Sequence, residues 1–185
     1  GPTGTANALA AISAAIARGV PDAVIDTALT AFKGVPNRLE RVDSGNGVTF
    51  VNDTSATAPV AAAATIRLLA ERDGALVVIA GGADKASDFS PMAAAIAETG
   101  VPLVLLDGSG TDRLRERLRE LGVDPGPAFG SLEGAFEAAL AIQTRPLTVV
   151  LTPGCASFGM FRNEFDRGEQ FRLLARNWCQ QSHRG

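Results

Sequence analysis

Two hydrophobic patterns alternate along the chain after residue 35. Short runs in which every residue is apolar, such as Leu76–Ala80, are separated by stretches in which apolar residues recur three or four positions apart. The runs predict buried strands, and the spaced pattern predicts helices. We therefore predict strands at 76–80, 103–106, 128–129 and 147–151 and helices at 59–71, 90–98, 111–121, 132–142 and 166–180. Polar and apolar residues alternate at 38–42 and 48–51, which predicts two further strands.

Buried strands that alternate with helices are typical of a parallel sheet covered by helices on both faces. We predict an α/β fold with a doubly wound, Rossmann-like, mostly parallel sheet. The pair Asn46-Gly47 separates the first two strands and is a strong signal for a tight turn. These two strands should therefore form an antiparallel hairpin at one edge of the sheet.

A helical hairpin is predicted ahead of the sheet. Residues 5–18 and 21–32 have helical periodicity, and Gly19 ends the first of these helices. Gly34 and Pro36 mark a boundary, so we divide the chain into a leading part, 1–34, and a main part, 35–185.

Composition narrows the classes of function. Basic residues number 17 and acidic residues 20, and the net charge of −3 argues against a generally basic surface for nucleic acid. The apolar runs are far shorter than the ~18 residues that span a bilayer, so no membrane segment is expected. Two cysteines and one histidine predict neither a disulfide scaffold nor a His-rich metal site, and they favour a reducing, cytoplasmic location. The one histidine, His183, lies in the terminal tail, which leaves a Ser-His-Asp triad without a base.

Polar residues follow four of the predicted strands. In an open α/β sheet, ligands bind beyond the carboxyl ends of the strands, so these segments should gather at one rim. The segments are Asn52–Pro59, Gly81–Phe89, Asp107–Thr111 and Thr152–Gly159. Each has a simpler explanation, because Asp, Ser and Thr cap helices and glycines permit tight turns. The sequence contains no Gly-x-x-x-x-Gly-Lys-Ser/Thr loop for a triphosphate, and the rim offers one well-placed cation, Lys85, to an anionic ligand.

Several of these segments match a known pattern, in order and spacing. They are Gly34-Val35-Pro36-Asn37-Arg38-Leu39-Glu40, Asn52-Asp53-Thr54-Ser55-Ala56-Thr57-Ala58-Pro59, Gly81-Gly82-Ala83-Asp84-Lys85, Pro153-Gly154-Cys155-Ala156-Ser157-Phe158 and Phe161-Arg162-Asn163-Glu164-Phe165-Asp166-Arg167-Gly168-Glu169-Gln170-Phe171. Together they resemble the Mur ligase family. Residues 1–11 also resemble the family pattern Gly-x-His-Asn-x-x-Asn-x-x-Ala-Ala, with Thr3 and Gly4 in place of the His and the first Asn.

The resemblance implies a three-domain, ATP-dependent ligase. In that case 1–34 holds the C-terminal helices of the central ATP-binding domain, and 35–185 is the C-terminal domain that binds glutamate. The implied reaction adds D-glutamate to UDP-N-acetylmuramoyl-L-alanine (UDP-muramoyl-alanine) through an acyl phosphate, in peptidoglycan precursor synthesis. ATP and magnesium are the implied cofactors. The phosphate loop, the magnesium ligands and the N-terminal domain are implied to lie outside this chain, which should be inactive alone.

The resemblance also implies roles for single residues. Nucleotide contacts are implied for four of them, namely Asn7 to adenine, Arg38 to phosphates, Asp53 to ribose hydroxyls, and Ser55 at a position where the family pattern Asn-Asp-Ser-Lys-Ala-Thr has Lys. Glutamate contacts are implied for Lys85, Thr57, Ser157, Phe158 and Asn163. Ser55 thus departs from the family pattern, and so does Asn37, because the family frequently has His at the position before the Arg. No catalytic residue and no metal ligand is assigned.

Two alternatives stay open. A ligase of the same family that attaches L-glutamate or another amino acid would use a similar site, since a cation and hydroxyl groups suit any dicarboxylate. A free-standing module that binds a nucleotide or metabolite would need no catalytic partner.

Overall fold

The structure, a computed structural model, describes residues 2–142 and 144–182. It divides into two compact units, Gly1–Gly34 and Val35–Gly185. His183, whose place in the terminal tail argued against a Ser-His-Asp triad, lies outside the described residues.

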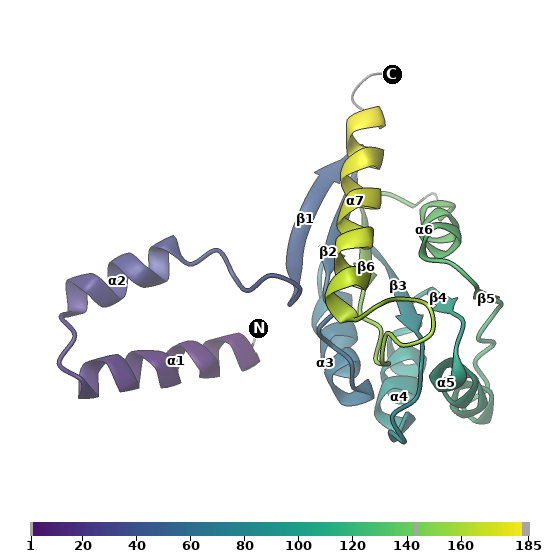
Figure 1. Cartoon of the computed structure of the whole chain (residues 1–185), viewed down its shortest axis with the longest axis horizontal. Helices are drawn as coiled ribbons and strands as arrows, with labels where there is room; N and C mark the ends of the chain where they lie inside the picture. Colours follow the sequence, from purple (N-terminus) through teal and green to yellow (C-terminus); the bar gives the residue numbers. More distant parts are fainter. Residues whose placement is uncertain (1, 143, 183–185) are drawn as a thin grey trace. The chain divides into compact units, whose positions relative to one another are not determined.

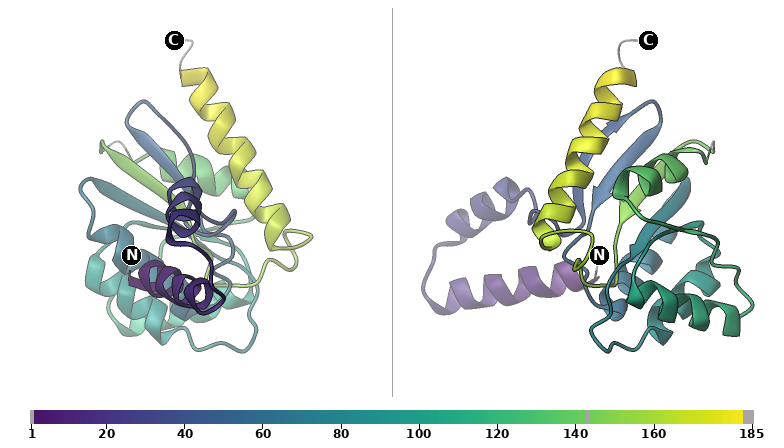
Figure 2. Two further views of the ribbon diagram at one scale, coloured as in Figure 1. Left: turned by 90° about the vertical axis from the view of Figure 1, so that its left-hand side faces the viewer. Right: turned by 45° about the vertical axis from the view of Figure 1, so that its right-hand side comes forward.

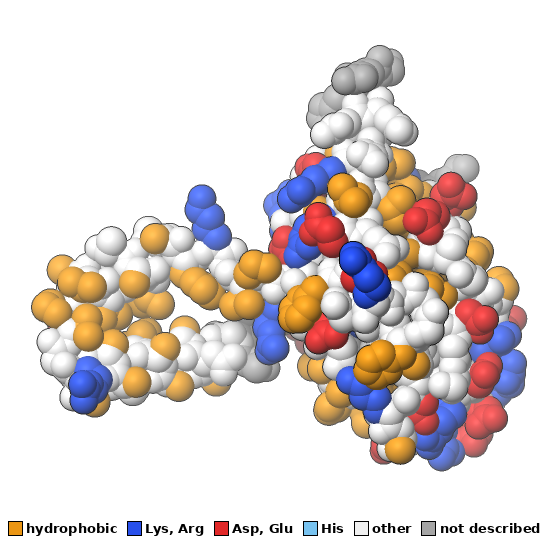
Figure 3. Space-filling view, viewed as in Figure 1, with side chains coloured by type: hydrophobic (Ala, Val, Ile, Leu, Met, Phe, Trp, Pro, Cys, Tyr) orange, Lys and Arg blue, Asp and Glu red, His pale blue; other side chains and the backbone are white. Residues whose placement is uncertain are grey.

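The first unit is a pair of helices, α1 (Pro2–Ala17) and α2 (Asp22–Ala31). The chain turns between them at Gly19, whose φ of 75° lies in the left-handed region that glycine adopts freely. Large apolar side chains on α1 are exposed, with 58% of Leu9 and 57% of Ile16 accessible to solvent. Figure 3 shows hydrophobic side chains over both helices. Exposed apolar side chains gathered in this way are typical of a surface that binds other protein.

The second unit contains one sheet. Its strands, in chain order, are β1 (Glu40–Gly45), β2 (Val48–Asn52), β3 (Ala75–Gly81), β4 (Leu103–Leu106), β5 (Ala128–Phe129) and β6 (Leu147–Leu151). They lie side by side in the order β1-β2-β6-β3-β4-β5 (Figure 1). β1 and β2 pair antiparallel, and the other neighbours pair parallel. The predicted mostly parallel sheet with an antiparallel edge hairpin is therefore confirmed.

Helices cover both faces of this sheet, as Figures 1 and 2 show. One face carries α3 (Pro59–Ala70), α4 (Ser90–Thr99) and α5 (Ser109–Glu120), and the other carries α6 (Leu132–Leu140) and α7 (Glu164–Ser182). Alternate side chains of each strand point to opposite faces, so both faces of a central strand must be apolar. In β3, Val78 and Ala80 pack in the core of the first face, and Val77 and Ile79 pack in the core of the second.

The boundaries differ from the predicted ones at three places that matter for the site. β1 begins at Glu40, two residues later than predicted, because Leu39 has a left-handed φ of 48° and lies with Arg38 in a turn. β1 extends to Gly45 because the turn uses only Asn46 and Gly47, whose φ values of 45° and 75° are those of a tight hairpin turn. α7 begins at Glu164, two residues earlier than predicted, because the Asn163 side chain caps its first turn. Among the described residues, no helix has both the length and the apolar character needed to span a bilayer.

Candidate functional site

Three loops meet beyond the carboxyl ends of β2, β6 and β3. The N–H of Gly154 donates to the carbonyl oxygen of Ala56 at 2.8 Å, which joins the loops after β6 and β2. Ala83 and Ala156 exchange two backbone hydrogen bonds of 3.0 and 2.9 Å, which join the loops after β3 and β6. These bonds bring together the loops that carry three predicted glutamate contacts, namely Thr57, Lys85 and Ser157.

Glycine at position 82 allows the close approach of two of these loops. Its φ is 132°, and a Cβ atom there would lie 2.5 Å from the carbonyl oxygen of Ala156. A side chain would therefore push the loop after β3 away from the loop after β6. The glycine that directly follows β3 therefore has a steric reason.

The loop that carries Lys85 is held in place by its neighbour, Asp84. The Asp84 carboxylate accepts from Arg113 at 2.7 Å and from the N–H of Ser87 at 3.0 Å, and the N–H of Asp84 donates to the Ser109 hydroxyl at 3.1 Å. The hydrogen bond from Arg113 lowers the pKa of the Asp84 carboxyl. Asp84 is thus a negatively charged anchor for the loop, at the side of an exposed ammonium.

The polar groups at this rim are available to a ligand. Lys85 is exposed, and its Nζ lies 5.9 Å from the centroid of the Phe158 ring. Ser157 is only 4% exposed, and Thr57 is half-buried. No hydrogen bond joins either hydroxyl to another residue that the structure describes. An ammonium and two hydroxyls on adjoining loops suit a carboxylate, with an aromatic ring near the ammonium to cover the bound group.

Burial makes Cys155 chemically inert at this rim. The residue is 2% exposed, and burial raises the pKa of its thiol to about 12. The thiolate is the nucleophilic form of cysteine, so this side chain is protonated and packs as a small apolar group at neutral pH.

A buried arginine ties α7 to the rim loops. Arg167 is 0% exposed, and its guanidinium donates to the Thr54 hydroxyl at 2.9 Å, to the Thr54 carbonyl at 3.1 Å and to the Cys155 carbonyl at 3.3 Å. Burial lowers the pKa of Arg167 to about 10, so the guanidinium stays charged at neutral pH. The resemblance gave Arg167 no role, and the structure shows it to be the main link between α7 and the loops after β2 and β6.

Asp53 lies inside the protein rather than on the rim surface. It is 3% exposed, and its carboxylate accepts from the N–H of Leu39 at 3.0 Å and from the hydroxyls of Thr65 and Thr152 at 2.7 and 3.0 Å. Burial raises the pKa of the Asp53 carboxyl, and these hydrogen bonds oppose the rise. With both oxygens occupied, Asp53 supports the neighbouring turn, and its implied ribose contact stays a prediction.

Arg38 projects from that turn into solvent. It is exposed, and no hydrogen bond ties its guanidinium to another described residue. The flanking residues Asn37 and Leu39 have left-handed backbone, with φ of 66° and 48°. A free guanidinium on a constrained turn fits the phosphate contact implied for Arg38.

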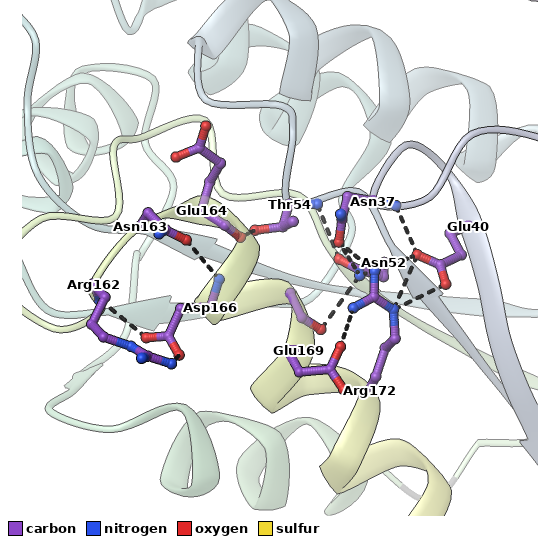
Figure 4. A network of polar contacts seen from close by, with 11 residues as sticks. Asn37, Glu40, Asn52, Thr54, Arg162, Asn163, Glu164, Asp166, Glu169 and Arg172 are labelled. Carbon is purple, nitrogen blue, oxygen red and sulfur yellow. Dashed lines mark hydrogen bonds and ion pairs between the residues drawn. The ribbon is translucent and has the colours of Figure 1, made fainter.

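The remaining predicted contacts fall at separate places. Asn163 accepts from the N–H of Asp166 at 2.9 Å and lines an open cavity of about 430 Å³ beside Arg162 and Arg172 (Figure 4). Lys85, Thr57 and Ser157 do not line this cavity. Ser55 is half-buried in the loop after β2, and its N–H donates to the Asn37 carbonyl at 3.1 Å. Asn7 is exposed on α1, in the first unit, and is not positioned by the sheet.

No group of three metal-binding side chains comes together within the part of the chain that the structure describes.

A family model and two similar sequences are all glutamate ligases. A family model described as the Mur ligase, glutamate ligase domain matches residues 37–156. A UDP-N-acetylmuramoylalanine–D-glutamate ligase from Roseiflexus sp. (strain RS-1) is 45% identical over 174 residues, or 93% of this chain. The enzyme of the same name from Burkholderia mallei (strain SAVP1) is 40% identical over 167 residues, or 90% of this chain.

The chain is shorter than these relatives, since the aligned region spans 37% of the first and 32% of the second. A solved structure, E. coli FolC in complex with ADP and without folate substrate, matches 96% of this chain with a TM-score of 0.61. The match covers 39% of that protein at 22% sequence identity, and at this identity the likeness shows the fold alone.

Proposed function

The chain belongs to the Mur ligase family, and from this premise we propose that it is the glutamate-binding, C-terminal part of an ATP-dependent ligase. The complete enzyme would join D-glutamate to UDP-N-acetylmuramoyl-L-alanine in peptidoglycan precursor synthesis. The observation that carries this proposal is that backbone hydrogen bonds join the loops of Lys85, Thr57 and Ser157, while no hydrogen bond ties these three side chains to another described residue.

Each of the three side chains forms a different contact with glutamate. The Lys85 ammonium forms an ion pair with one carboxylate of glutamate, and the hydroxyls of Thr57 and Ser157 donate to carboxylate oxygens. Phe158 lies beside the ammonium and covers the bound amino acid. Glutamate held in this way presents its amine in a fixed direction, which replaces a random encounter by a positioned attack.

ATP, when bound, supplies the phosphoryl group that activates the accepting carboxylate. Arg38 is the residue of this chain that would contact its phosphates, because its guanidinium is exposed and has no hydrogen-bond partner among the described residues. An activated carboxylate is lost to water unless the amine is brought to it and water is excluded. Orienting the amine and closing over the activated group are thus the tasks of this domain.

Helices α1 and α2 belong, in this proposal, to the end of the central ATP-binding domain. Their exposed apolar side chains support this assignment, because such side chains need further protein to cover them. The chain alone then lacks the phosphate loop and the magnesium ligands, and we expect it to form no product by itself.

The test is amide formation by a complete ligase that carries this chain, measured as ATP-dependent transfer of radiolabelled D-glutamate to UDP-N-acetylmuramoyl-L-alanine. The same assay with L-glutamate separates the proposal from a same-family ligase of other specificity. Product from D-glutamate supports the proposal, and product from L-glutamate alone contradicts it. Substantial product from the 185-residue chain without a partner would contradict the proposed division of the enzyme.

A further inference from the structure

The turn that carries Arg38 has an unusual backbone. Asn37 and Leu39, on either side of Arg38, both have left-handed φ values, 66° and 48°. Residues other than glycine adopt this region rarely, and bulky residues such as leucine adopt it only where surrounding contacts compensate for it. The conformation of this turn therefore depends on what holds it.

Backbone groups of the turn are held from two directions. The N–H of Asn37 donates to Glu40 Oε2 at 2.7 Å, and the N–H of Leu39 donates to Asp53 Oδ1 at 3.0 Å. The carbonyl oxygen of Asn37 accepts from the N–H of Ser55 at 3.1 Å. The turn is thus attached both to the start of β1 and to the loop after β2.

Arg172 on α7 completes this attachment (Figure 4). Its Nη2 donates to Asn37 Oδ1 at 2.6 Å and to Glu40 Oε2 at 3.0 Å, and its Nε donates to Glu40 Oε1 at 3.0 Å. The contact is largely buried, with 11% of the Arg172 side chain and 23% of the Glu40 side chain exposed. Asn52 adds a further hydrogen bond of 3.0 Å to Asn37 Oδ1.

The planar fork of arginine suits this arrangement. Nη2 and Nε point to the two oxygens of one carboxylate while Nη2 also reaches the amide oxygen of Asn37, and a lysine ammonium cannot reproduce that pattern. Burial alone would raise the pKa of the Glu40 carboxyl, but the hydrogen bonds from Arg172 and Asn37 outweigh it and lower the pKa. Glu40 is therefore ionised at neutral pH and paired with Arg172.

We propose that Arg172 and Glu40 are positioning residues that direct Arg38 toward the phosphates of a bound nucleotide. Arg38 has no side-chain hydrogen bond to another described residue, so the direction of its side chain follows from the backbone of its turn. Glu40, at the start of β1, and Arg172, on the distant helix α7, fix that backbone. This role rests on the proposed function, because it needs a nucleotide next to Arg38.

Direct attraction of the nucleotide by Arg172 explains the geometry less well. Its guanidinium already contacts two carboxylates, Glu40 and, through Nη1 at 2.6 Å, Glu169. Little of its charge is left for a ligand, whereas the exposed Arg38 guanidinium forms no hydrogen bond with another described residue.

The experiment measures ADP binding by calorimetry in a complete ligase that carries this chain. Arg172→Met and Arg172→Lys should each raise the Kd for ADP about tenfold, which corresponds to about 1.4 kcal/mol, and should leave the Kd for glutamate unchanged. Hydrogen exchange of the Asn37 and Leu39 amides should be faster in both variants. Glu169→Gln is the matched control, since it removes the other carboxylate partner of Arg172 and does not touch the turn. It should change neither the Kd for ADP nor the hydrogen exchange of the Asn37 and Leu39 amides.

The outcomes separate the two proposals. If Arg38→Ala leaves ADP affinity unchanged, the nucleotide role of this turn fails, and the positioning role fails with it. If Arg38→Ala weakens binding but Arg172→Met does not, only the positioning role is overturned. Wild-type affinity in Arg172→Lys would show that charge rather than the fork matters, which also overturns it. If Arg172→Met does not fold, Arg172→Lys and Glu40→Gln, which keep the size of the side chains, carry the same test.

Discussion

Arg167 donates a hydrogen bond from Nε to the hydroxyl of Thr54 at 2.9 Å, with none of the arginine exposed. Among the described residues, no carboxylate forms an ion pair with this guanidinium, and its other hydrogen bonds go to the carbonyl oxygens of Thr54 and Cys155. A buried charge that is held only by neutral acceptors is costly, and such a group is retained where its several donors organise the surrounding chain. Here the donors hold two loops of the candidate site against α7.

Replacing Arg167 by methionine should destabilise the second unit. The substitution removes a costly buried charge, but it leaves the hydroxyl and carbonyl of Thr54 and the carbonyl of Cys155 without their donors. The free energy of unfolding should fall by about 1–3 kcal/mol. Urea denaturation followed by the fluorescence of Trp178 checks this, because the ring centroids of Trp178 and Phe50 lie 5.4 Å apart in the core of that unit.

Arg162→Met is the control for this measurement. Arg162 forms an ion pair with Asp166, but 85% of its side chain is exposed, so the pair contributes little and the change should stay within about 0.5 kcal/mol. Equal losses in the two variants would show that Arg167 is no more than an ordinary surface arginine.

Lys85→Ala in a complete ligase should weaken the binding of glutamate and not that of ATP. Removing the ammonium deletes a charge-assisted bond of about 1.5–3 kcal/mol, so the KM for glutamate should rise at least tenfold while the KM for ATP changes little. Steady-state kinetics with each substrate varied in turn measures both constants. Arg119→Ala, which removes an exposed charge from α5, should leave them unchanged. A similar rise in both constants for Lys85→Ala would contradict the assignment of this residue.

Asp53 gives the stability of the second unit a particular pH dependence. Because burial raises the pKa of this carboxyl above its ordinary value of 3.8, the folded state prefers the protonated form. Its contribution to stability is present below pH 3.8 and is lost as the pH rises through the raised pKa. Asp53→Asn keeps an acceptor for the N–H of Leu39 and carries no charge, so its stability relative to the wild type should improve between about pH 4 and pH 7. Urea denaturation at both pH values tests this, and a difference that does not change with pH would contradict it.

The fold could be predicted because its signals are local. The run at 76–80 is all apolar and the run at 147–151 is apolar except for Thr148, so both have the composition of strands that are buried on both faces. Asn46-Gly47 has the backbone preference of a hairpin turn. The rim could be predicted in the same way, since parallel strands bring the segments after their carboxyl ends to one edge.

The polar interior of the site could not be predicted from local signals. Arg167 and Arg172 lie in a helical segment where arginine is normally a solvated charge, and their partners, Thr54 and Glu40, are more than 100 residues away in the sequence. The internal hydrogen bonds of Asp53 could not be predicted for the same reason. A carboxylate directly after a strand is typical of a ligand contact or a helix cap, and only the structure shows Thr65 and Thr152 bound to it. Such contacts depend on the packing of α7 and α3 against the sheet, which no spacing rule describes.

Gly82→Ala should damage the site more than the fold. A Cβ atom at residue 82 would lie 2.5 Å from the carbonyl oxygen of Ala156, and the φ of 132° is strained for any residue with a side chain. The two hydrogen bonds between Ala83 and Ala156 must therefore lengthen or break, which separates the loop of Lys85 from the loop of Ser157. We expect a loss of stability of about 1–3 kcal/mol and a rise in the KM for glutamate in the complete ligase.

Gly100→Ala distinguishes this steric effect from the backbone preference of glycine. Gly100 also has a positive φ, 61°, but nothing lies within 4 Å of the position of an added Cβ, and the residue follows α4 rather than the rim. Its substitution should cost about 1 kcal/mol of stability and should leave the KM for glutamate unchanged. If both variants raise that KM equally, general destabilisation explains the effect. If only Gly82→Ala raises it, the close contact of the two loops is what aligns the ammonium of Lys85 with the hydroxyl of Ser157.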